Sequence, residues 1–346
     1  MSTNSRFLMI LLVLLTITAV TACISPVPPA PAVPAAPALT TVKVGYLPVV
    51  SNGPLYLAEE EGYFARQGIK LDLVKFRNGA ETIPALLNGD IAAGGATVSP
   101  ALINAISKGA HVRIVADKGR NAPGYSCNVS GLMVRREIFE RGVVTKVSDL
   151  KGKKITSAEG QEYKLVRVLK MGNLTPGDVE VVSMDMASGV MAIRNGAVDA
   201  IDTTEPFVTQ LLDERAAVML VPTEESSPDF PTPLYYGPAF LDRDPDLGRR
   251  FMVAYLEGVR QYNLGKTERN IEILSNYTHL DRDLLERSCW VPVARNGDLP
   301  RQPVRDYIDW MYANKEISLN PDDDQVFDVS YVTYAEGVLQ NSTNTR

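Results

Sequence analysis

The sequence predicts an α/β protein with two lobes, each a mainly parallel sheet flanked by helices. Two observations lead to this prediction. Strand-like and helix-like segments alternate steadily from residue 41, and a second, similar run of alternation starts near residue 125. Such alternation is typical of α/β proteins with a largely parallel sheet. A chain of 346 residues is also long enough for two domains of ordinary size.

In the first run, residues 41–46 alternate and are rich in β-branched side chains, which favours a strand. A proline-containing loop covers 47–54. The helix that follows places Leu55, Tyr56 and Ala58 on one face, and Gly68 lies just past its end. The remaining predicted elements of this run are strand 69–76, helix 79–88, strand 92–94, a helix opened by 97–100 that reaches 107, and strand 112–117.

The second run repeats this order and ends in a helical region. Its predicted elements are strand 132–134, a return into a strand at 155, helix 162–171, strand 179–182, helix 188–195, and strands 200–202 and 217–221. Beyond Pro233 the pattern becomes helical, with segments near 247–264, 267–276 and 303–314. Segments near 120–125 and 231–237 are rich in Pro, Gly and Tyr, which predicts two crossings between the lobes.

These crossings divide the chain into lobe 1, residues 40–122 plus 234–346, and lobe 2, residues 123–233. In open α/β sheets the ligand lies beyond the carboxyl ends of the strands. We therefore expect a site between the lobes, and closure by hinge motion around a bound ligand.

The N-terminus has the order of an export signal. Arg6 supplies a positive charge, residues 7–20 form an apolar run too short for a comfortable membrane span, and small residues lead to Cys23. Residues 20–23 resemble a bacterial lipobox, which implies a signal peptide over 1–22 and lipidation of Cys23. An ordinary secretory signal is the alternative. The Pro/Ala-rich segment 23–39 is predicted to be an extended tether, because such a chain forms no packed core.

Composition argues against several classes of protein. The net charge is -6 and no basic stripe appears, so no nucleic-acid partner is expected. Only His111 and His279 are available as histidines, and the cysteine spacings match no zinc pattern, so we expect neither a metal site nor a cofactor. Cys127 and Cys289 either form a disulfide in an oxidising compartment or remain two separate buried thiols.

Several short segments then show a family resemblance. Residues 45–48, 54–59 and 61–65 resemble the N-terminal lobe of ABC-importer binding proteins for thiamine pyrimidines, riboflavin, alkanesulfonates and nitrate. Residues 87–92, 149–155 and 196–200 are similar to the family's later signposts, and the likeness runs from about 41 to 265. The resemblance implies a two-lobed periplasmic-binding-protein fold of type II. It also implies a permease and an ATPase as partners, a monomer, and a place on the outer face of the cell membrane.

The resemblance implies that ligand contacts come from loops after strands. The candidate ligand-binding residues are Tyr46, Asn52, Tyr56, Thr97, Ser99, Tyr125, Asn128, Glu162, Tyr163 and Glu205. Structural roles compete with binding at most of these positions. Asn52 equally suits a turn, Thr97 and Ser99 suit a helix cap, and Tyr125 and Asn128 suit hinge packing.

The acidic candidates decide the predicted ligand. Glu159 and Glu162 suit a helix start, but they would repel a sulfonate there, and Glu205 adds a third carboxylate. Arg77 and Arg120 are the only arginines at comparable loops. Carboxylates, amides and tyrosines favour an aromatic heterocycle, so riboflavin is predicted first and a thiamine pyrimidine precursor next. An alkanesulfonate, taurine or nitrate is the alternative ligand. A pyrimidine-synthesising enzyme is the alternative of another class, although no catalytic Ser-His-Asp or Cys-His pattern is evident.

Overall fold

The computed structural model describes residues 38–77, 79–95, 97–120, 125, 127–157, 162–228 and 230–344. The predicted signal peptide, Cys23 and nearly all of the predicted tether lie outside these residues, as does Glu159. Residues Leu39–Arg346 form one compact unit, and this unit contains both sheets described below.

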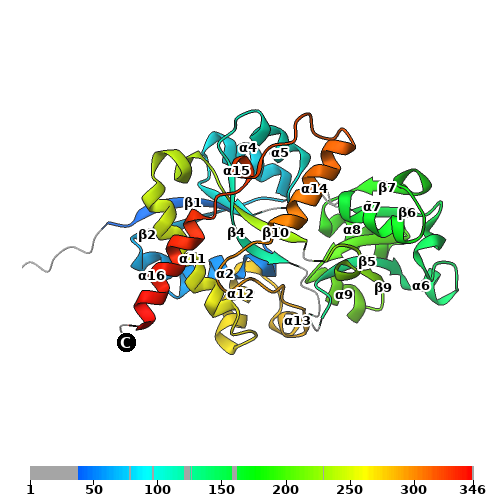
Figure 1. Cartoon of the computed structure of the whole chain (residues 1–346). Coiled ribbons are helices and arrows are strands. Elements are labelled where there is room, and N and C mark those ends of the chain that lie inside the picture. Colours follow the sequence, from blue (N-terminus) through cyan, green and yellow to red (C-terminus); the bar gives the residue numbers. More distant parts are fainter. Residues whose placement is uncertain are drawn as a thin grey trace, which may run out of the picture. The chain divides into compact units, whose positions relative to one another are not determined.

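The first sheet has five strands in the order β2-β1-β3-β10-β4 (Figure 1). Their bounds are β1 Thr40–Tyr46, β2 Ile69–Lys75, β3 Ala93–Gly95, β4 Arg113–Arg120 and β10 Pro231–Tyr236. Strand β1 pairs in parallel with β2 and β3, whereas β10 is antiparallel to both β3 and β4. The carboxyl ends of β1, β2, β3 and β4 therefore meet at one edge of this sheet.

Helices pack on both faces of the first sheet. They are α2 Gly53–Glu60, α3 Tyr63–Arg66, α4 Gly79–Asn88, α5 Pro100–Ser107, α11 Pro245–Tyr262, α12 Glu268–Thr278, α13 Arg282–Arg287, α14 Arg301–Ala313, α15 Asp323–Val326 and α16 Ser330–Asn344, with short turns of helix at Val50–Asn52 and Ala239–Arg243. Helix α11 is amphipathic, and its apolar face is buried against α2. Gly258 permits this close approach, because a Cβ there would lie 2.1 Å from the carbonyl oxygen of Pro54.

The second sheet has the order β7-β6-β8-β5-β9. Its strands are β5 Ser130–Arg135, β6 Lys154–Ser157, β7 Glu180–Ser183, β8 Ala200–Thr204 and β9 Ala217–Pro222. Its helices are α6 Arg136–Glu140, α7 Glu162–Met171, α8 Met186–Arg194, α9 Phe207–Asp213 and α10 Thr223–Ser226, with 3-10 turns at Val147–Leu150 and Pro176–Asp178. Strands β6, β7 and β8 are parallel, and β5 is antiparallel to β8 and β9. The predicted α/β fold with two sheets flanked by helices is confirmed, and both sheets are mixed, because β10 and β5 run antiparallel to their neighbours.

The second predicted crossing needs a correction. Residues 231–237 are not a free connection, because Pro231–Tyr236 form β10 inside the first sheet. Proline cannot donate a hydrogen bond to a neighbouring strand, and the pairing of β10 with β4 shifts register between Pro231 and Pro233. A proline-rich segment therefore looked like a loop although it pairs as a strand. The limits of lobe 1, residues 40–122 plus 234–346, and of lobe 2, residues 123–233, remain a prediction.

Covalent and hydrogen-bond contacts join the segment after β4 to a distant part of the chain. Cys127 and Cys289 form a disulfide across 162 residues of sequence. The alternative of two separate thiols is not what the structure shows. The amide of Arg120 donates to the carbonyl oxygen of Pro292 at 3.2 Å, and the amide of Asp117 to that of Gly297 at 2.9 Å. Residues 289–297 thus run beside the carboxyl end of β4.

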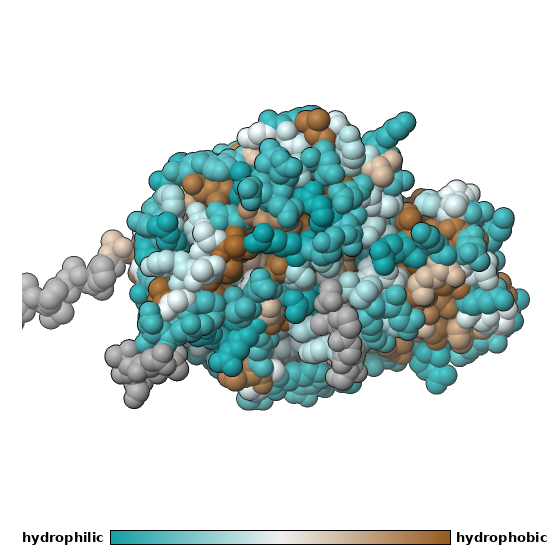
Figure 2. Space-filling model, in the orientation of Figure 1, coloured by the Kyte–Doolittle hydropathy of each residue, from teal (hydrophilic) through white to brown (hydrophobic). Residues whose placement is uncertain are grey.

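Within the described part of the chain, no helix is both long and apolar enough to cross a bilayer. Figure 2 shows a face that is mainly hydrophilic over the lobe containing α4, α15 and α16, with hydrophobic atoms in small groups. Single exposed apolar side chains of this kind are normal on folded proteins.

Candidate functional site

A buried lysine lies at the carboxyl edge of the first sheet. Lys118, near the end of β4, is 2% exposed, and its Nζ donates to Ser51 Oγ at 3.0 Å. Ser51 belongs to the loop after β1. Gly95, at the end of β3, leaves room for the lysine stem, because a Cβ at Gly95 would lie 2.3 Å from Lys118 Cε. Three strand ends therefore converge on one ammonium group, where open α/β sheets bind ligands.

Burial lowers the pKa of Lys118 to about 8, and the neighbouring Asp117 carboxylate opposes part of this effect. The Asp117 carboxylate itself accepts hydrogen bonds from the amides of Gly119 and Ala294 at 2.9 and 2.7 Å. An ammonium carries three donors, and Ser51 takes one of them. A buried cation with unused donors is costly without a ligand and favourable beside an anion.

Two more buried polar atoms lie near this edge, one from the turn after β1 and one from the end of α11. Asn52 is fully buried and its Nδ2 donates to the carbonyl oxygen of Leu47 at 2.6 Å, while its Oδ1 has no hydrogen-bond partner. Tyr262, whose ring lies against Gly53, is 2% exposed and its hydroxyl also lacks a partner. Asn52 therefore stabilises the turn after β1 through its Nδ2, while its Oδ1 is an acceptor without a hydrogen bond.

The tyrosines predicted at this loop behave differently from Asn52. Tyr56 is fully buried, donates to the carbonyl oxygen of Leu47 at 3.0 Å and stacks on Tyr277 at 4.7 Å between ring centroids. Burial raises its pKa far above the usual range. Tyr46 is partly buried and meets Tyr56 edge to face at 5.9 Å. Tyr56 is thus tied into the core of the first lobe.

The remaining first-lobe candidates lie at a helix cap and a crossing. Ser99 caps α5, because its Oγ accepts from the amide of Leu102 at 3.3 Å. Thr97 is half-buried in the loop between Gly95 and that cap. Tyr125 is 43% exposed and Asn128 is exposed, both on the segment that leads from β4 to β5. This segment also carries Cys127 of the disulfide.

The second lobe presents buried polar atoms at its own strand ends. Thr156 and Ser157 end β6, and Asp202 and Thr203 lie on the adjacent β8. All four are less than a tenth exposed, and each has one oxygen without a hydrogen-bond partner. The nearest charge is Lys164 in the first turn of α7, whose Nζ lies 3.9 Å from Asp202 Oδ2. Burial raises the pKa of Asp202, and Lys164 opposes part of that rise.

Helix α7 also forms an aromatic contact with the first lobe. Tyr163 is 6% exposed and stacks on Tyr307 of α14 at 4.6 Å, with Phe230 and Trp310 beside the pair. Arg167 donates to the Tyr163 hydroxyl at 3.1 Å. Glu162, exposed at the start of α7, raises the pKa of Tyr307 after the larger effect of burial. Tyr163 therefore contributes to packing between α7 and α14.

Glu205, by contrast, is fully engaged by the protein. Its carboxylate accepts from the amide and the hydroxyl of Thr209 at 3.0 and 2.7 Å, and from the amide of Cys289 at 2.8 Å. It is 6% exposed. The carboxylate thereby closes the first turn of α9 and holds the disulfide segment beside the second lobe.

We expect Glu205→Ala to destabilise the protein and to change ligand affinity by less than about threefold. Removal of the carboxylate leaves two buried amides unsatisfied, which costs about 2–4 kcal/mol. Urea unfolding would measure the loss, with the exposed Glu225→Ala as control. Unchanged stability combined with weaker binding would instead restore the role predicted from the sequence.

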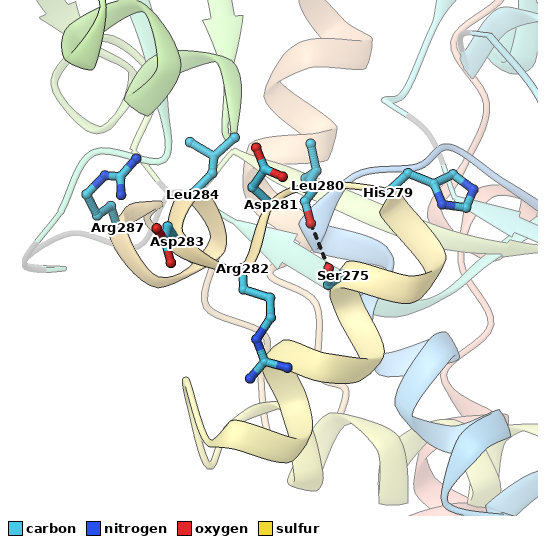
Figure 3. Close-up of a pocket in the computed structure, with 8 residues that line it drawn as sticks. All are labelled: Ser275, His279, Leu280, Asp281, Arg282, Asp283, Leu284 and Arg287. Atoms are coloured by element: carbon cyan, nitrogen blue, oxygen red, sulfur yellow. Dashed lines mark hydrogen bonds between the residues drawn. The ribbon is translucent and has the colours of Figure 1, made fainter.

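A separate depression is lined by residues of α12, α13 and their connection. Figure 3 shows charged side chains around it along α12, α13 and their connection. Its volume is about 600 Å³. Ser275 Oγ donates to the carbonyl oxygen of Leu280 at 2.7 Å within it, and Arg287 pairs with Asp213 of α9 at 2.9 Å. No strand residue lines this depression.

The two arginines considered from the sequence lie at the surface and at the end of a strand. Arg77 forms an exposed ion pair with Glu81 at 2.6 Å, and Arg120 ends β4. Across the residues that the structure describes, no group of three or more His, Cys, Asp or Glu side chains is arranged to hold a metal ion.

Comparison with known proteins identifies the family. The family described as "NMT1/THI5 like" matches residues 51–263. The chain belongs to the NMT1/THI5-like family. The recognition of this family from its N-terminal segments is therefore confirmed.

Several known proteins are similar to this chain in sequence or in structure. A putative binding protein from Brucella abortus is 26% identical over 262 residues, 74% of this chain and 76% of that protein. The taurine-binding periplasmic protein of Escherichia coli is 28% identical over half of each chain. The periplasmic nitrate-binding protein of Synechocystis has the same fold with a TM-score of 0.71 at 17% identity, over 88% of this chain and 90% of that one. The desulfurization enzyme DSZB shares the fold with a TM-score of 0.63 at 14% identity, over 86% and 99%.

The sequence interpretation missed Lys118, Lys164 and Asp202. A signal existed for Lys118 and Asp202, because they lie at or just after the ends of the predicted strands 112–117 and 200–202. Arginines were considered there and lysines were not.

Proposed function

We propose that this protein is the solute-binding component of an ABC importer and that it captures a small oxyanion between its lobes. One observation carries the proposal. Lys118 is a cation, 2% exposed, at the meeting point of three strand ends, and it has donors to spare. An anion that accepts from Lys118 would repay the cost of burying the charge.

The relatives support an anionic ligand. Proteins similar in sequence to this chain are named for taurine and bicarbonate, and a structural neighbour is named for nitrate. Sulfonate, bicarbonate and nitrate all present oxygen acceptors to an ammonium donor. The chemistry of Lys118 and Ser51 matches this shared feature, whatever the remainder of the ligand is.

The vitamin-type ligand predicted from the sequence is the competing proposal. It depends on three glutamates facing the ligand. The Glu205 carboxylate has three donors from its own chain, and Glu159 lies outside the described residues. Glu162 alone is an exposed carboxylate close to the α7–α14 contact. Riboflavin and thiamine pyrimidines therefore belong in the test as rivals.

Binding without catalysis, followed by delivery to a permease with its ATPase, completes the proposed role. The desulfurization enzyme DSZB is only 14% identical to this chain, so the similarity supports a shared fold and no shared activity. We also propose an extracytoplasmic monomer anchored through lipidated Cys23. The disulfide suits an oxidising compartment outside the cytoplasm. A membrane-fraction protein whose N-terminal peptide carries no acyl chain by mass spectrometry would exclude the anchor.

A ligand panel measured by thermal shift tests the proposal. It contains nitrate, bicarbonate, acetate, ethanesulfonate, taurine, riboflavin and an aminopyrimidine. A ligand at a hundred times its Kd adds about 2.7 kcal/mol of stability, which raises Tm measurably. We expect a rise with at least one oxyanion. A rise with riboflavin or the pyrimidine alone would overturn the oxyanion proposal and favour the vitamin role.

A further inference from the structure

The second lobe contains unsatisfied buried polar atoms that the oxyanion site does not use. Ser157 Oγ is 5% exposed and Asp202 is 8% exposed, and neither Ser157 Oγ nor Asp202 Oδ2 has a hydrogen-bond partner. Buried polar groups of folded proteins are nearly always paired, so such a concentration at adjacent strand ends requires an explanation. A ligand that enters from the strand edge supplies one.

Strand geometry places Ser157 and Asp202 on the same face of the sheet as α7. Side chains two residues apart point to the same face of a strand. Ile155 and Ala200, two residues before Ser157 and Asp202, pack with Leu165 of α7 in one apolar cluster. Strands β6 and β8 are neighbours in parallel register at Ile155–Ala200 and Thr156–Ile201. Ser157 and Asp202 therefore stand side by side under the first turn of α7.

Lys164 lies beside Asp202, but it is not hydrogen-bonded to Asp202. Its Nζ lies 3.9 Å from Asp202 Oδ2, which is too far for a hydrogen bond. Its side chain is 12% exposed. Both charges are thus mostly buried, and they face each other without a direct hydrogen bond. We call Ser157, Lys164 and Asp202 the lobe-2 polar group.

The two opposite charges limit what can bind between them. An ammonium would be repelled by Lys164, and a second anion would be repelled by Asp202. A neutral group that donates to Asp202 Oδ2 and accepts from Lys164 Nζ or Ser157 Oγ satisfies all three residues. A hydroxyl or a carboxamide has this combination of donor and acceptor.

We propose that the lobe-2 polar group binds a neutral hydroxyl or carboxamide of the ligand, and that the substrate class is a small organic monoanion bearing such a group. This inference rests on the proposed oxyanion function. Lys118 and Ser51 in the first lobe take the anionic end, and the lobe-2 polar group takes the neutral polar end. Closure of the lobes then brings both ends of the ligand into contact with protein.

Matched ligands test the inference. Calorimetry would compare ethanesulfonate, 2-hydroxyethanesulfonate and taurine, together with propanoate, 3-hydroxypropanoate and β-alanine. Within each set the members differ only in a terminal hydrogen, hydroxyl or ammonium. We expect the hydroxyl member of at least one set to bind tenfold or more tightly than its two partners.

Variants attribute the preference to named residues. We expect Asp202→Ala to reduce the tenfold preference to less than threefold, while the Kd of the unsubstituted acid changes by less than threefold. Lys164→Met serves as a second variant if Asp202→Ala fails to fold. Glu180→Ala is the matched control, because it breaks an exposed glutamate–lysine pair with Lys154, 2.9 Å apart, on neighbouring strands. Glu180→Ala should leave the preference intact.

The outcomes separate the two proposals. Equal binding within a set, to within threefold, overturns the lobe-2 inference and leaves the oxyanion function standing. Preference for the ammonium member overturns the neutral group in favour of a zwitterion. Absence of binding by every acid, with Tm unchanged by nitrate and bicarbonate as well, overturns the proposed function and the inference with it.

Discussion

Lys118→Met is expected to weaken binding of the oxyanion by about tenfold to a hundredfold, since charge-assisted hydrogen bonds contribute about 1.5–3 kcal/mol each. The same substitution should stabilise the ligand-free protein. A pKa lowered from 10.5 to about 8 means that burying the charge costs about 3 kcal/mol at neutral pH. Methionine keeps a similar stem in the space above Gly95 without that cost. Calorimetry and urea unfolding would measure the two opposite changes.

Two further variants make this result specific. Lys43→Met removes an exposed lysine from β1 of the same sheet and should change neither affinity nor stability appreciably. Gly95→Ala keeps Lys118 but forces its stem aside, because the added methyl would lie 2.3 Å from Cε. We expect Gly95→Ala to weaken binding as well. Lower affinity in Lys43→Met equal to that of Lys118→Met would show a general charge effect and would remove Lys118 from the site.

The pH dependence follows from the direction of the Lys118 shift. The folded protein loses this proton near pH 8, whereas the unfolded chain keeps it until about pH 10.5. Between these values the unfolded chain binds more protons, so the contribution of Lys118 to stability rises with pH over that window. Oxyanion affinity should fall over the same window, because the ammonium is lost. An affinity that is flat from pH 7 to 9.5 would contradict the assignment.

Removal of the disulfide, in Cys127→Ser/Cys289→Ser, is expected to lower the free energy of unfolding by about 2–5 kcal/mol. The bond closes a loop of 162 residues and so restricts the unfolded chain strongly. It also ties the segment after β4 to the segment that Glu205 holds through the Cys289 amide. Urea unfolding of the oxidised protein and of the double variant would measure the difference.

A matched comparison separates the bond from the serine substitutions. The wild-type protein in the presence of a reductant should lose about the same stability as the double variant, and the double variant should not respond to the reductant. Equal stability of oxidised and reduced wild-type protein would show that the bond does not stabilise the fold. A reductant effect in the double variant would show that the loss has another origin.

The sequence alone determined the α/β class, the order of the elements and the family. Alternation of apolar residues is a local property, so Glu162–Met171 was predicted with the bounds that α7 has. Helix α11 and strand β9 were also placed to within about two residues, the usual precision of element ends. The family followed from short segments that mark turns and strand starts, and residues 51–263 match it.

Tertiary structure decided which buried polar side chains have hydrogen-bond partners within the protein. Glu205 and Asp202 are both acidic residues beside β8, and nothing local distinguishes them. The amide of Cys289, far away in sequence, donates to Glu205, while Asp202 Oδ2 remains without a hydrogen bond. The role of a carboxylate depends on donors brought in by other parts of the chain, and periodicity carries no information about them.

Contacts between distant parts of the chain also explain why the sequence did not predict β10 as a strand or Lys118 as a buried residue. Pro231–Tyr236 resembles a loop by composition but pairs with β3 and β4, because strand pairing is a non-local choice. Lys118 looks like an ordinary polar residue at the end of a strand. Its burial depends on Ser51, Gly95 and the segment 289–297, which come together only in the folded protein. The sequence by itself therefore determined the scaffold, and only the tertiary structure decided which charged side chains are buried and what they contact.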